Sequence, residues 1–269
     1  SDLLSVSANI FVGQTEAPLL VRPFIKNMTQ SELMTVMTGG FATVAGGVLA
    51  LYVTWLGDIP GIAGHLLAAS VMSAPAALAI AKIIYPETEL SETAGEINIK
   101  VKKVDANSMD ALGRGATEGL KLAANVGAML IAFVSIVSMI NYLLAIGGTS
   151  LEEIFAFVFK PLAWTMGVPW KEAGIMGMLM GEKIAFTELI AYGDLKDLLA
   201  SGQISDRTAI IASYALCGFA NFGSIGIQLG GIGGMAPERR KDLAKIVGKA
   251  MIGGALASWL TATIAGMLI

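Results

Sequence analysis

Five long runs of the sequence carry no Asp, Glu, Lys or Arg, and they limit the possible folds more than any other feature. Each run has 20 to 27 residues, and together they cover 33–57, 59–81, 123–146, 209–235 and 250–269. A helix rises about 1.5 Å per residue, so about 20 residues cross a hydrocarbon layer of about 30 Å. Because lipid offers the backbone no hydrogen-bond partners, each run is predicted to be a transmembrane helix.

The composition agrees with a membrane protein and excludes several classes of function. Charged residues make up 14% of the chain and the mean hydropathy is +0.69, whereas soluble domains have about 25% charged residues. A net charge of −3 leaves no basic surface for nucleic acid. With one cysteine, Cys217, and one histidine, His65, the chain has no intramolecular disulfide and no Cys- or His-cluster metal site. A soluble enzyme, a disordered chain and a nucleic-acid binder are therefore excluded.

Two further apolar stretches, 3–21 and 173–192, are interrupted by glycine and polar residues. The interruptions are, in chain order, Gly13-Gln14-Thr15-Glu16, Pro18, Gly181-Glu182-Lys183 and Thr187-Glu188. The halves between them are too short to span a bilayer, so both stretches are predicted to be re-entrant helical hairpins whose tips reach the middle of the membrane. Irregular backbone at that depth must line protein or a watery cavity.

The chain contains signs of an internal repeat. Gly40-Phe41-Ala42-Thr43 recurs as Gly218-Phe219-Ala220-Asn221, and each copy lies in an uncharged run. Helix starts are predicted before both copies, at 29–32 and 205–206, and also at Ser150, which should begin a short interfacial helix over 150–158. Each copy also follows a hairpin with one carboxylate that is predicted to be buried, Glu16 or Glu188. Chance similarity in a Gly- and Ala-rich chain is the alternative.

The distribution of basic residues predicts how the two copies are oriented. The loop 238–249 has five Lys and Arg residues, which places it on the cytoplasmic side. Counting spans back from it, the two copies enter from opposite sides, as in inverted-repeat transporters. We predict an all-α polytopic membrane protein with a first repeat at 1–85, an amphipathic helix at 108–121 and a scaffold helix within 86–148, and a second repeat at 149–269.

Glu16 and Glu188 are the ionisable residues best placed to carry chemistry. A charge within the hydrocarbon costs roughly 2.5–3.5 kcal/mol, so it is expected to have a use. A carboxylate accepts hydrogen bonds from vicinal hydroxyls or from a ring N–H. The structural alternatives are that Glu188 pairs with Lys183 and that Glu16 caps a broken helix end.

Several uncharged residues near these acids have two interpretations each. The Gln14 amide, with Thr15 beside it, suits the edge of a nucleobase, but both residues also suit the satisfaction of loose backbone. Asn221 and Ser224 are three residues apart and are predicted to share a helix face, where they bind a ligand or join two helices. Phe219 either stacks on a flat ligand or packs in the core. A neutral oxygen set suitable for Na⁺ at an unwound helix comprises the side chains of Asn9 and Thr43 and the carbonyls of Val12 and Val44.

The stretches 13–20 (GQTEAPLL) and 218–226 (GFANFGSIG) resemble the concentrative nucleoside transporters. The resemblance runs over essentially all 269 residues. It implies a homotrimer of cation-coupled nucleoside symporters in which a transport domain moves like an elevator against a trimeric scaffold. It also implies that this chain corresponds to the C-terminal two-thirds of a member, with three transmembrane helices and an interfacial helix expected before the first hairpin.

The same resemblance assigns roles to individual residues. Substrate is expected to be bound by Gln14, Thr15, Glu16 and Val48 on the base side and by Glu188, Asn221 and Ser224 on the ribose side, with Phe219 packed beside the ligand. Sodium is expected at Asn9, Val12, Thr43 and Val44. Two departures from the family pattern are Thr43, where Ser is common, and Thr187-Glu188-Leu189, where Asn-Glu-Phe is common.

The sequence thus predicts a transporter and not an enzyme: a sodium-coupled symporter that imports nucleosides as a multi-pass protein of the cell inner membrane. Its predicted partners are the nucleoside, Na⁺ as coupling ion, the lipid bilayer and two further copies of the chain, with no nucleic acid and no cofactor. A proton-coupled symporter, with a buried carboxylate as the proton carrier, is the first alternative. From other classes, the alternatives are an intramembrane enzyme that uses a Glu pair as acid and base, and a structural scaffold.

Overall fold

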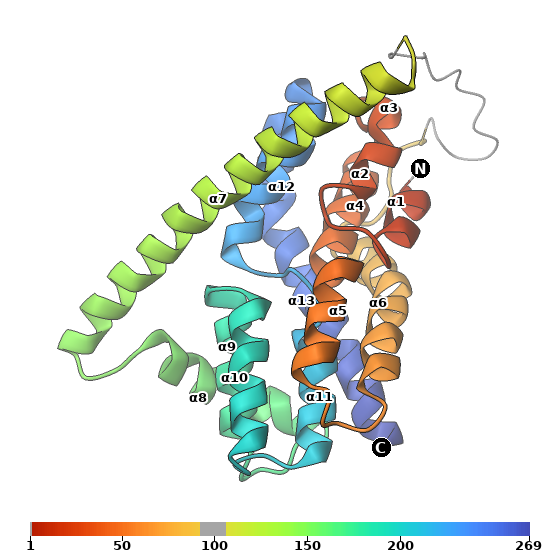
Figure 1. Cartoon of the computed structure of the whole chain (residues 1–269). Coiled ribbons are helices and arrows are strands. Elements are labelled where there is room, and N and C mark those ends of the chain that lie inside the picture. The colour runs from red at the N-terminus through yellow and green to blue at the C-terminus, as the bar shows by residue number, and fades with distance from the viewer. Residues whose placement is uncertain (1, 92–105) are drawn as a thin grey trace.

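The computed structural model describes residues 2–91 and 106–269, and this part of the chain contains helices and no strand (Figure 1). The elements, in chain order, are α1 (Asp2–Ala8), α2 (Ala17–Leu20), α3 (Arg22–Ile25), α4 (Gln30–Ala42), α5 (Gly46–Trp55), α6 (Ile62–Ile84), α7 (Ser108–Ile146), α8 (Leu151–Thr165), α9 (Ala173–Ala185), α10 (Glu188–Ala200), α11 (Asp206–Leu216), α12 (Phe222–Met235), the 3₁₀-helix η1 (Pro237–Arg239) and α13 (Arg240–Leu268).

The predicted helix starts are confirmed by their caps. Thr29 and Glu32 form a reciprocal capping box at the start of α4, in which Thr29 Oγ1 accepts from the Glu32 N–H and the Glu32 carboxylate accepts from the Thr29 N–H. Ser205 caps α11 by accepting from the Thr208 N–H, and Ser150 caps α8 by accepting from the Glu153 N–H. These side chains satisfy backbone N–H groups that have no partner inside the helix.

Both Gly-Phe-Ala copies lie at a helix break, as predicted. Three residues, 43–45, separate α4 from α5, and five residues, 217–221, separate α11 from α12. The breaks touch, because the Phe219 N–H donates to the Thr43 carbonyl at 3.3 Å. Gly218 has φ +129°, and a Cβ there would lie 2.8 Å from the Phe41 carbonyl oxygen, so both its backbone angle and its surroundings require glycine.

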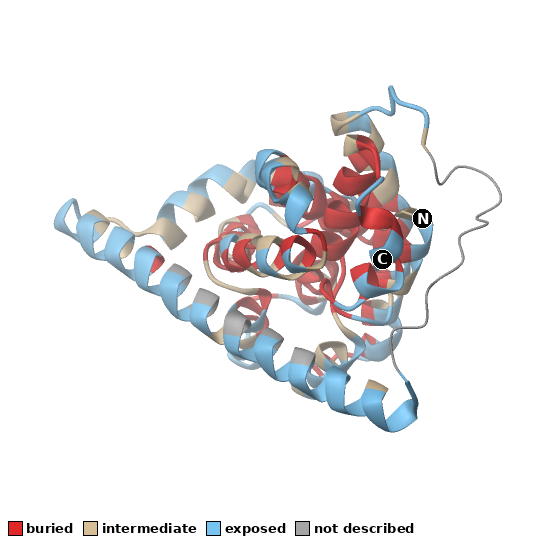
Figure 2. Cartoon of the chain, turned by 90° about the horizontal axis from the view of Figure 1, so that it is seen from above, coloured by how far each residue is buried: buried red, intermediate tan, exposed pale blue. Residues whose placement is uncertain are grey.

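Close helix packing puts the core at the centre of the molecule, where α4, α6, α11 and α13 meet (Figure 2). A Cβ at Gly254 of α13 would lie 2.3 Å from the Phe41 Cβ of α4, so the two backbones approach to a distance that only glycine permits. In contrast, α7 runs along one side of the molecule with most of its described side chains exposed.

In the described part of the chain, three helical segments are long and apolar enough to cross a membrane, against the five predicted. They are Gln30–Trp55, which contains the first break, Ile62–Ile84 and Pro237–Leu268. The pair Val134–Ile146 and Leu151–Thr165, which bends by 90°, counts as a fourth if it forms one span. The predicted run 209–235 is divided into α11 and α12 by the second break, and the run 123–146 belongs to α7.

The predicted amphipathic helix and the predicted interfacial helix are both longer in the structure. The predicted amphipathic helix over 108–121 is the first part of the 39-residue α7, because no helix-breaking residue separates it from the apolar run that follows. The rest of that predicted region, 92–105, lies outside the described residues. The predicted helix over 150–158 continues as α8 to Thr165, with Pro161 inside it.

The second hairpin has one break where two were predicted. Residues Gly181-Glu182-Lys183 are helical within α9, and the chain reverses only at Phe186 and Thr187. A Cβ at Gly181 would lie 2.2 Å from the Phe155 Cβ of α8, and one at Gly177 would lie 2.8 Å from the Ala156 carbonyl oxygen. These glycines therefore let α8 and α9 pack closely, and they do not interrupt the helix.

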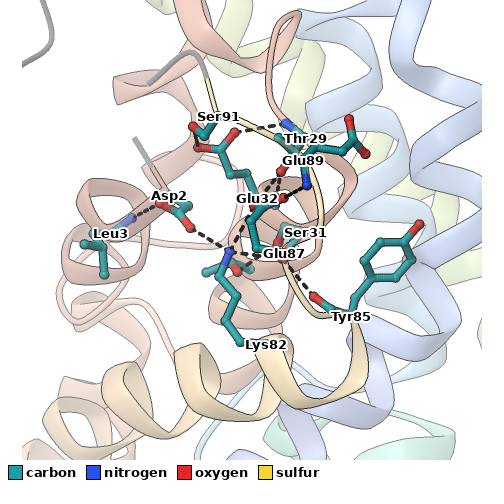
Figure 3. Close-up of polar contacts among 11 residues, drawn as sticks. Asp2, Leu3, Thr29, Ser31, Glu32, Lys82, Tyr85, Glu87, Glu89 and Ser91 are labelled. Carbon is teal, nitrogen blue, oxygen red and sulfur yellow. Dashed lines mark hydrogen bonds and ion pairs between the residues drawn. The ribbon is translucent and has the colours of Figure 1, made fainter. Parts of the chain in front are cut away.

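A polar cluster joins the first hairpin to α4 and α6 (Figure 3). The Lys82 ammonium lies 3.4 Å from the Asp2 carboxylate and 3.6 Å from the Glu87 carboxylate, and it donates to Ser31 Oγ at 3.0 Å. The Thr29 hydroxyl also donates to Glu87, at 2.8 Å. The start of α1 is thereby tied to the start of α4 and the end of α6, which holds the first hairpin in place.

Candidate functional site

All eight residues predicted to bind substrate line one cavity of about 320 Å³. They come from the tip of the first hairpin, the start of α5, the tip of the second hairpin and the second break. The residues that line the cavity are Gly13, Gln14, Thr15, Glu16, Ala45, Val48, Thr187, Glu188, Leu189, Phe219, Asn221, Ser224 and Ile227. Segments more than 200 residues apart in sequence thus meet around one space.

The second hairpin presents a buried carboxylate to this cavity. Glu188 is the first residue of α10 and its side chain is 5% exposed. Its Oε1 accepts from the Tyr52 hydroxyl at 3.1 Å, and its Oε2 accepts from Asn221 Nδ2 at 3.2 Å. A carboxylate has about four lone-pair positions, so these two bonds leave acceptor capacity for a ligand hydroxyl.

The alternative for Glu188, a direct ion pair with Lys183, is not found among the described residues, although the two opposite charges attract each other. Lys183 is fully buried one turn before the hairpin tip, and its ammonium donates to the Ala215 carbonyl at 2.9 Å and to Ser258 Oγ at 2.8 Å. Ala215 belongs to the last turn of α11, where helix carbonyls lack helical partners. Lys183 therefore fastens the second hairpin to the end of α11 and to α13.

Asn221 has a different position from the one predicted. It is the N-cap of α12 and does not share a helix face with Ser224, because its Oδ1 accepts from the Ser224 N–H at 2.8 Å. The same bond leaves its Nδ2 free to donate to Glu188. Phe219 is half-buried at the second break, and Val48 is half-buried in the first turn of α5.

The first hairpin presents an amide whose partners are on α12. Gln14 Nε2 donates to Ser224 Oγ at 2.9 Å, and Gln14 Oε1 accepts from Gln228 Nε2 at 3.2 Å. Thr15 is buried beside it, and its hydroxyl donates to Glu16 Oε2 at 3.0 Å. A Cβ at Gly231 would lie 2.8 Å from Thr15 Cγ2, so the tip rests directly on the α12 backbone.

The prediction that Glu16 is buried is wrong, although Glu16 lines the cavity. Thr15 and Glu16 also line a second cavity of about 420 Å³, which α7 and α12 help to enclose. Glu16 lies between the two spaces, and this explains its exposure. It precedes α2 without making a side-chain cap bond, so the alternative role as a helix cap is also wrong.

The predicted sodium ligands come from the first hairpin and the first break. Asn9 is fully buried, and neither its Oδ1 nor its Nδ2 has a hydrogen-bond partner among the described residues. A Cβ at Gly39 would lie 3.5 Å from Asn9 Nδ2, and the Gly39 carbonyl accepts from Thr43 Oγ1 at 3.0 Å. The side chains of Asn9 and Thr43 thus both lie next to Gly39.

The two remaining predicted ligands lie close by in the chain. Val44 is buried within the first break, and Val12 precedes the hairpin tip and is 36% exposed. The Gly46 N–H donates to the Phe11 carbonyl at 2.9 Å, so the hairpin is joined to the start of α5. In the described part of the chain, no group of three or more His, Cys, Asp or Glu side chains could hold a metal ion.

Three residues at the site escaped the sequence analysis. Tyr52 lies in an uncharged run without a motif around it. Lys183 drew attention only as a partner for Glu188, although a lysine in an apolar stretch signals a structural tether. Gln228 is fully buried on α12, one helical turn after Ser224, and the spacing of four residues is the signal that could have found it.

The fold and the cavity define a helical membrane protein with a polar, ligand-sized site between two hairpins. The family model described as "Na+ dependent nucleoside transporter C-terminus" matches residues 65–266. This chain belongs to that family, the concentrative nucleoside transporters.

Relatives and solved structures agree with this assignment. The chain is 47% identical to an uncharacterized transporter of Haemophilus influenzae over 100% of this chain and 66% of that protein. It is 43% identical to sodium/nucleoside cotransporter 1 of Mus musculus over 100% of this chain and 44% of that protein. The structure of CNTnw in an inward-facing substrate-bound state matches 98% of this chain and 64% of that one, with 48% identity and a TM-score of 0.81.

The chain therefore spans about two thirds of one relative and less than half of the other. The homologues are transporters and not enzymes, in agreement with the prediction.

Proposed function

We propose that this chain carries the substrate and cation sites of a sodium-coupled nucleoside symporter that imports nucleosides. The observation that carries the proposal is the convergence of the eight predicted substrate residues around one cavity of about 320 Å³. Small-ligand sites have volumes of about 300–1,000 Å³ and combine apolar walls with a few polar groups. This cavity has both, and the family membership adds the substrate class.

The two sides of the cavity suit the two parts of a nucleoside. On one side, Glu188 and Asn221 offer a carboxylate and an amide, which match the vicinal hydroxyls of ribose. On the other side, Gln14 and Thr15 offer amide and hydroxyl donors and acceptors, which match the edge of a base. Val48 and Phe219 supply apolar surface between them. The base thus faces the first hairpin and the sugar faces the second.

Sodium binds, in this proposal, between the first hairpin and the first break. A buried amide without partners is costly, so the Asn9 side chain supports the binding of a ligand at that position. Na⁺ favours oxygen ligands such as the Asn9 side chain, the Thr43 hydroxyl and the carbonyls of Val12 and Val44. An ion held there would fasten the tip that carries Gln14, Thr15 and Glu16. It would thereby raise the affinity for nucleoside, and nucleoside must raise the affinity for Na⁺ by the same factor.

The proposal includes a homotrimer in the cell inner membrane and an elevator-type movement of the two hairpins with their broken helices. The position of α7 supports a separate scaffold, because this helix stands apart from the core and is joined to it mainly through α12 and α8 (Figure 1). Its exposed apolar residues, among them Ile131, Tyr142 and Leu143, require cover by lipid or by another copy of the chain.

One observation favours proton coupling as the second candidate. Glu182 is buried in α9, and the carboxyl of Asp194 on α10 lies close to it. Neighbouring carboxyl groups in a buried site disfavour each other's charged form, so such a site favours holding a proton. This pair, which also has Glu152 of α8 nearby, would be the proton carrier in a proton-coupled symporter.

Uptake of radiolabelled uridine into proteoliposomes separates these candidates. The chain is tested alone and extended to the length of its relatives, with an imposed gradient of Na⁺ or of H⁺. Sodium coupling predicts accumulation that follows the Na⁺ gradient at constant pH. Accumulation that follows pH and ignores Na⁺ selects the proton-coupled candidate, and the absence of saturable uptake from the extended protein under both gradients contradicts nucleoside transport.

A further inference from the structure

Gln228 lies behind the cavity and contacts a residue that lines it. It is fully buried on α12, does not line the cavity, and donates through Nε2 to Gln14 Oε1 at 3.2 Å and to the Met37 carbonyl at 3.1 Å. Ser224, four residues earlier on the same helix, accepts from Gln14 Nε2 at 2.9 Å. The Gln14 amide is therefore held at both ends by α12.

The direction of this hydrogen-bond chain is set by a group that cannot turn. The Met37 carbonyl belongs to the backbone of α4 and only accepts hydrogen bonds, so the Gln228 nitrogen must face it. The same nitrogen donates to Gln14, and so the oxygen of Gln14 must face Gln228. The nitrogen of Gln14 then points to Ser224. A reversed Gln14 amide would set its N–H groups against those of Gln228.

The two amides lie against the backbone of α4 at a glycine. A Cβ at Gly40 of α4 would lie 2.8 Å from Gln228 Nε2 and 3.1 Å from Gln14 Cβ. The side chains of Gln14 and Gln228 thus pack directly on the backbone of α4 at Gly40, where no side chain intervenes. The first Gly-Phe-Ala copy therefore supplies space for the amide pair one helical turn before the break, in addition to the break itself.

We infer that Gln228 is a positioning residue that locks the Gln14 amide in one orientation and so determines which nucleobase edge the site accepts. This inference rests on the proposed function. An amide has two N–H groups and two lone pairs, so one N–H and one lone pair of Gln14 are left for the ligand. As long as Gln228 is present, the positions of this N–H and this lone pair of Gln14 relative to each other are fixed.

Uridine and cytidine distinguish a locked amide from a free one. Their ribose groups are identical, but position 4 of the base is an acceptor in uracil and a donor in cytosine, and position 3 is a donor in uracil and an acceptor in cytosine. A Gln14 amide locked in one orientation matches the order of donor and acceptor in one of these bases and places like groups against each other in the other base. An amide that can turn over matches either, and then the site discriminates less.

The test is the ratio of the uridine and cytidine concentrations that half-inhibit radiolabelled nucleoside uptake into proteoliposomes. Gln228→Met keeps the length of the side chain and removes its hydrogen bonds. We expect the ratio to move about fivefold toward one, the value of one ordinary hydrogen bond, mainly because the disfavoured nucleoside binds better. The dependence of uptake on Na⁺ should stay as in the unmodified protein. Gln203→Met, the same change at an exposed glutamine far from the cavity, is the control.

Each outcome has one meaning. An unmodified protein that takes up both nucleosides equally well, or a Gln228→Met variant that keeps the original ratio, overturns the role of Gln228 and leaves nucleoside transport intact. An unmodified protein without any uptake contradicts the proposed function itself. If Gln228→Met does not accumulate as folded protein, Gln228→Leu is measured in the same way, and an unchanged ratio there also overturns the inference.

Discussion

The first hairpin is short and irregular, whereas the second is long and regular. The first consists of helical pieces of 7, 4 and 4 residues, with a non-helical segment at 9–16 that includes the polar tip. The second consists of two 13-residue helices, α9 and α10, which meet at Phe186 and Thr187. Both tips reach the same cavity, but they bring different chemistry to it.

The difference follows from how much helix supports each tip. In the second hairpin, close packing of α9 on α8 and the Lys183 tether support the buried carboxylate of Glu188, which has two defined partners. In the first hairpin, loose backbone brings amides, a hydroxyl and the unpartnered Asn9 to the same region. A rigid element suits a fixed contact to the sugar, and an irregular element suits a site that an ion can complete. The following predictions test this contrast.

The largest effect is expected from removing the charge of Glu188 at the tip of the second hairpin. Glu188→Gln should weaken nucleoside binding about 10- to 150-fold, because a hydrogen bond to a charged group contributes about 1.5–3 kcal/mol. Sodium binding should weaken less. Glu16→Gln in the first hairpin, at an exposed carboxylate, should have a clearly smaller effect. Calorimetric titration of both variants with uridine and with Na⁺ measures this, and equal losses for the two ligands in Glu188→Gln would contradict its role toward the sugar.

The rigidity of the second hairpin depends on Gly181. Gly181→Ala should destabilise the protein by about 1–3 kcal/mol, because its Cβ would lie 2.2 Å from the Phe155 Cβ and α8 or α9 must shift. Gly174→Ala, on the same helix with open space around it, is the matched control and should stay within about 0.5 kcal/mol of the unmodified protein. Thermal unfolding in detergent measures the stability of both variants. Similar melting temperatures would show that α8 and α9 can shift apart at little cost in free energy.

The irregular hairpin should be the one that responds to sodium. Asn9→Ala should raise the Na⁺ concentration for half-maximal uptake by about tenfold, or about 1.4 kcal/mol, and leave the uridine affinity at saturating Na⁺ nearly unchanged. Ser7→Ala, at an exposed position two residues earlier in α1, is the control. If Asn9→Ala keeps the original sodium response in uptake measurements, the ion does not bind there.

The smallest effect is expected from Tyr52 of α5, which donates a hydrogen bond to Glu188. Tyr52→Phe removes the hydroxyl that donates to Glu188 and keeps the ring that stacks on Tyr192 at 3.9 Å between centroids. Uridine affinity should fall about fivefold, the value of one hydrogen bond of about 1 kcal/mol. Melting temperature should change little. A loss as large as that of Glu188→Gln would mean that Tyr52 contacts the ligand itself.

Most of the element order was predictable because lipid restricts a backbone to helices and leaves few kinds of interruption. Local signals such as the Thr29 and Ser205 caps identified where helices begin. The role of Gly181 was not predictable, because a glycine that breaks a helix and one that accommodates Phe155 look alike in sequence. The exposure of Glu16 was not predictable either, because it depends on a second cavity beside the first.

The sequence by itself determined which residues are polar within apolar surroundings. Its two motifs carried the family resemblance, which named eight of the thirteen residues that line the cavity. The tertiary structure alone decided their partners. Tyr52 with Glu188, Lys183 with Ala215, and Gln228 with Gln14 are pairs separated by 32 to 214 residues. A sequence pattern follows from the geometry of one helix, whereas these contacts depend on how different helices pack against each other.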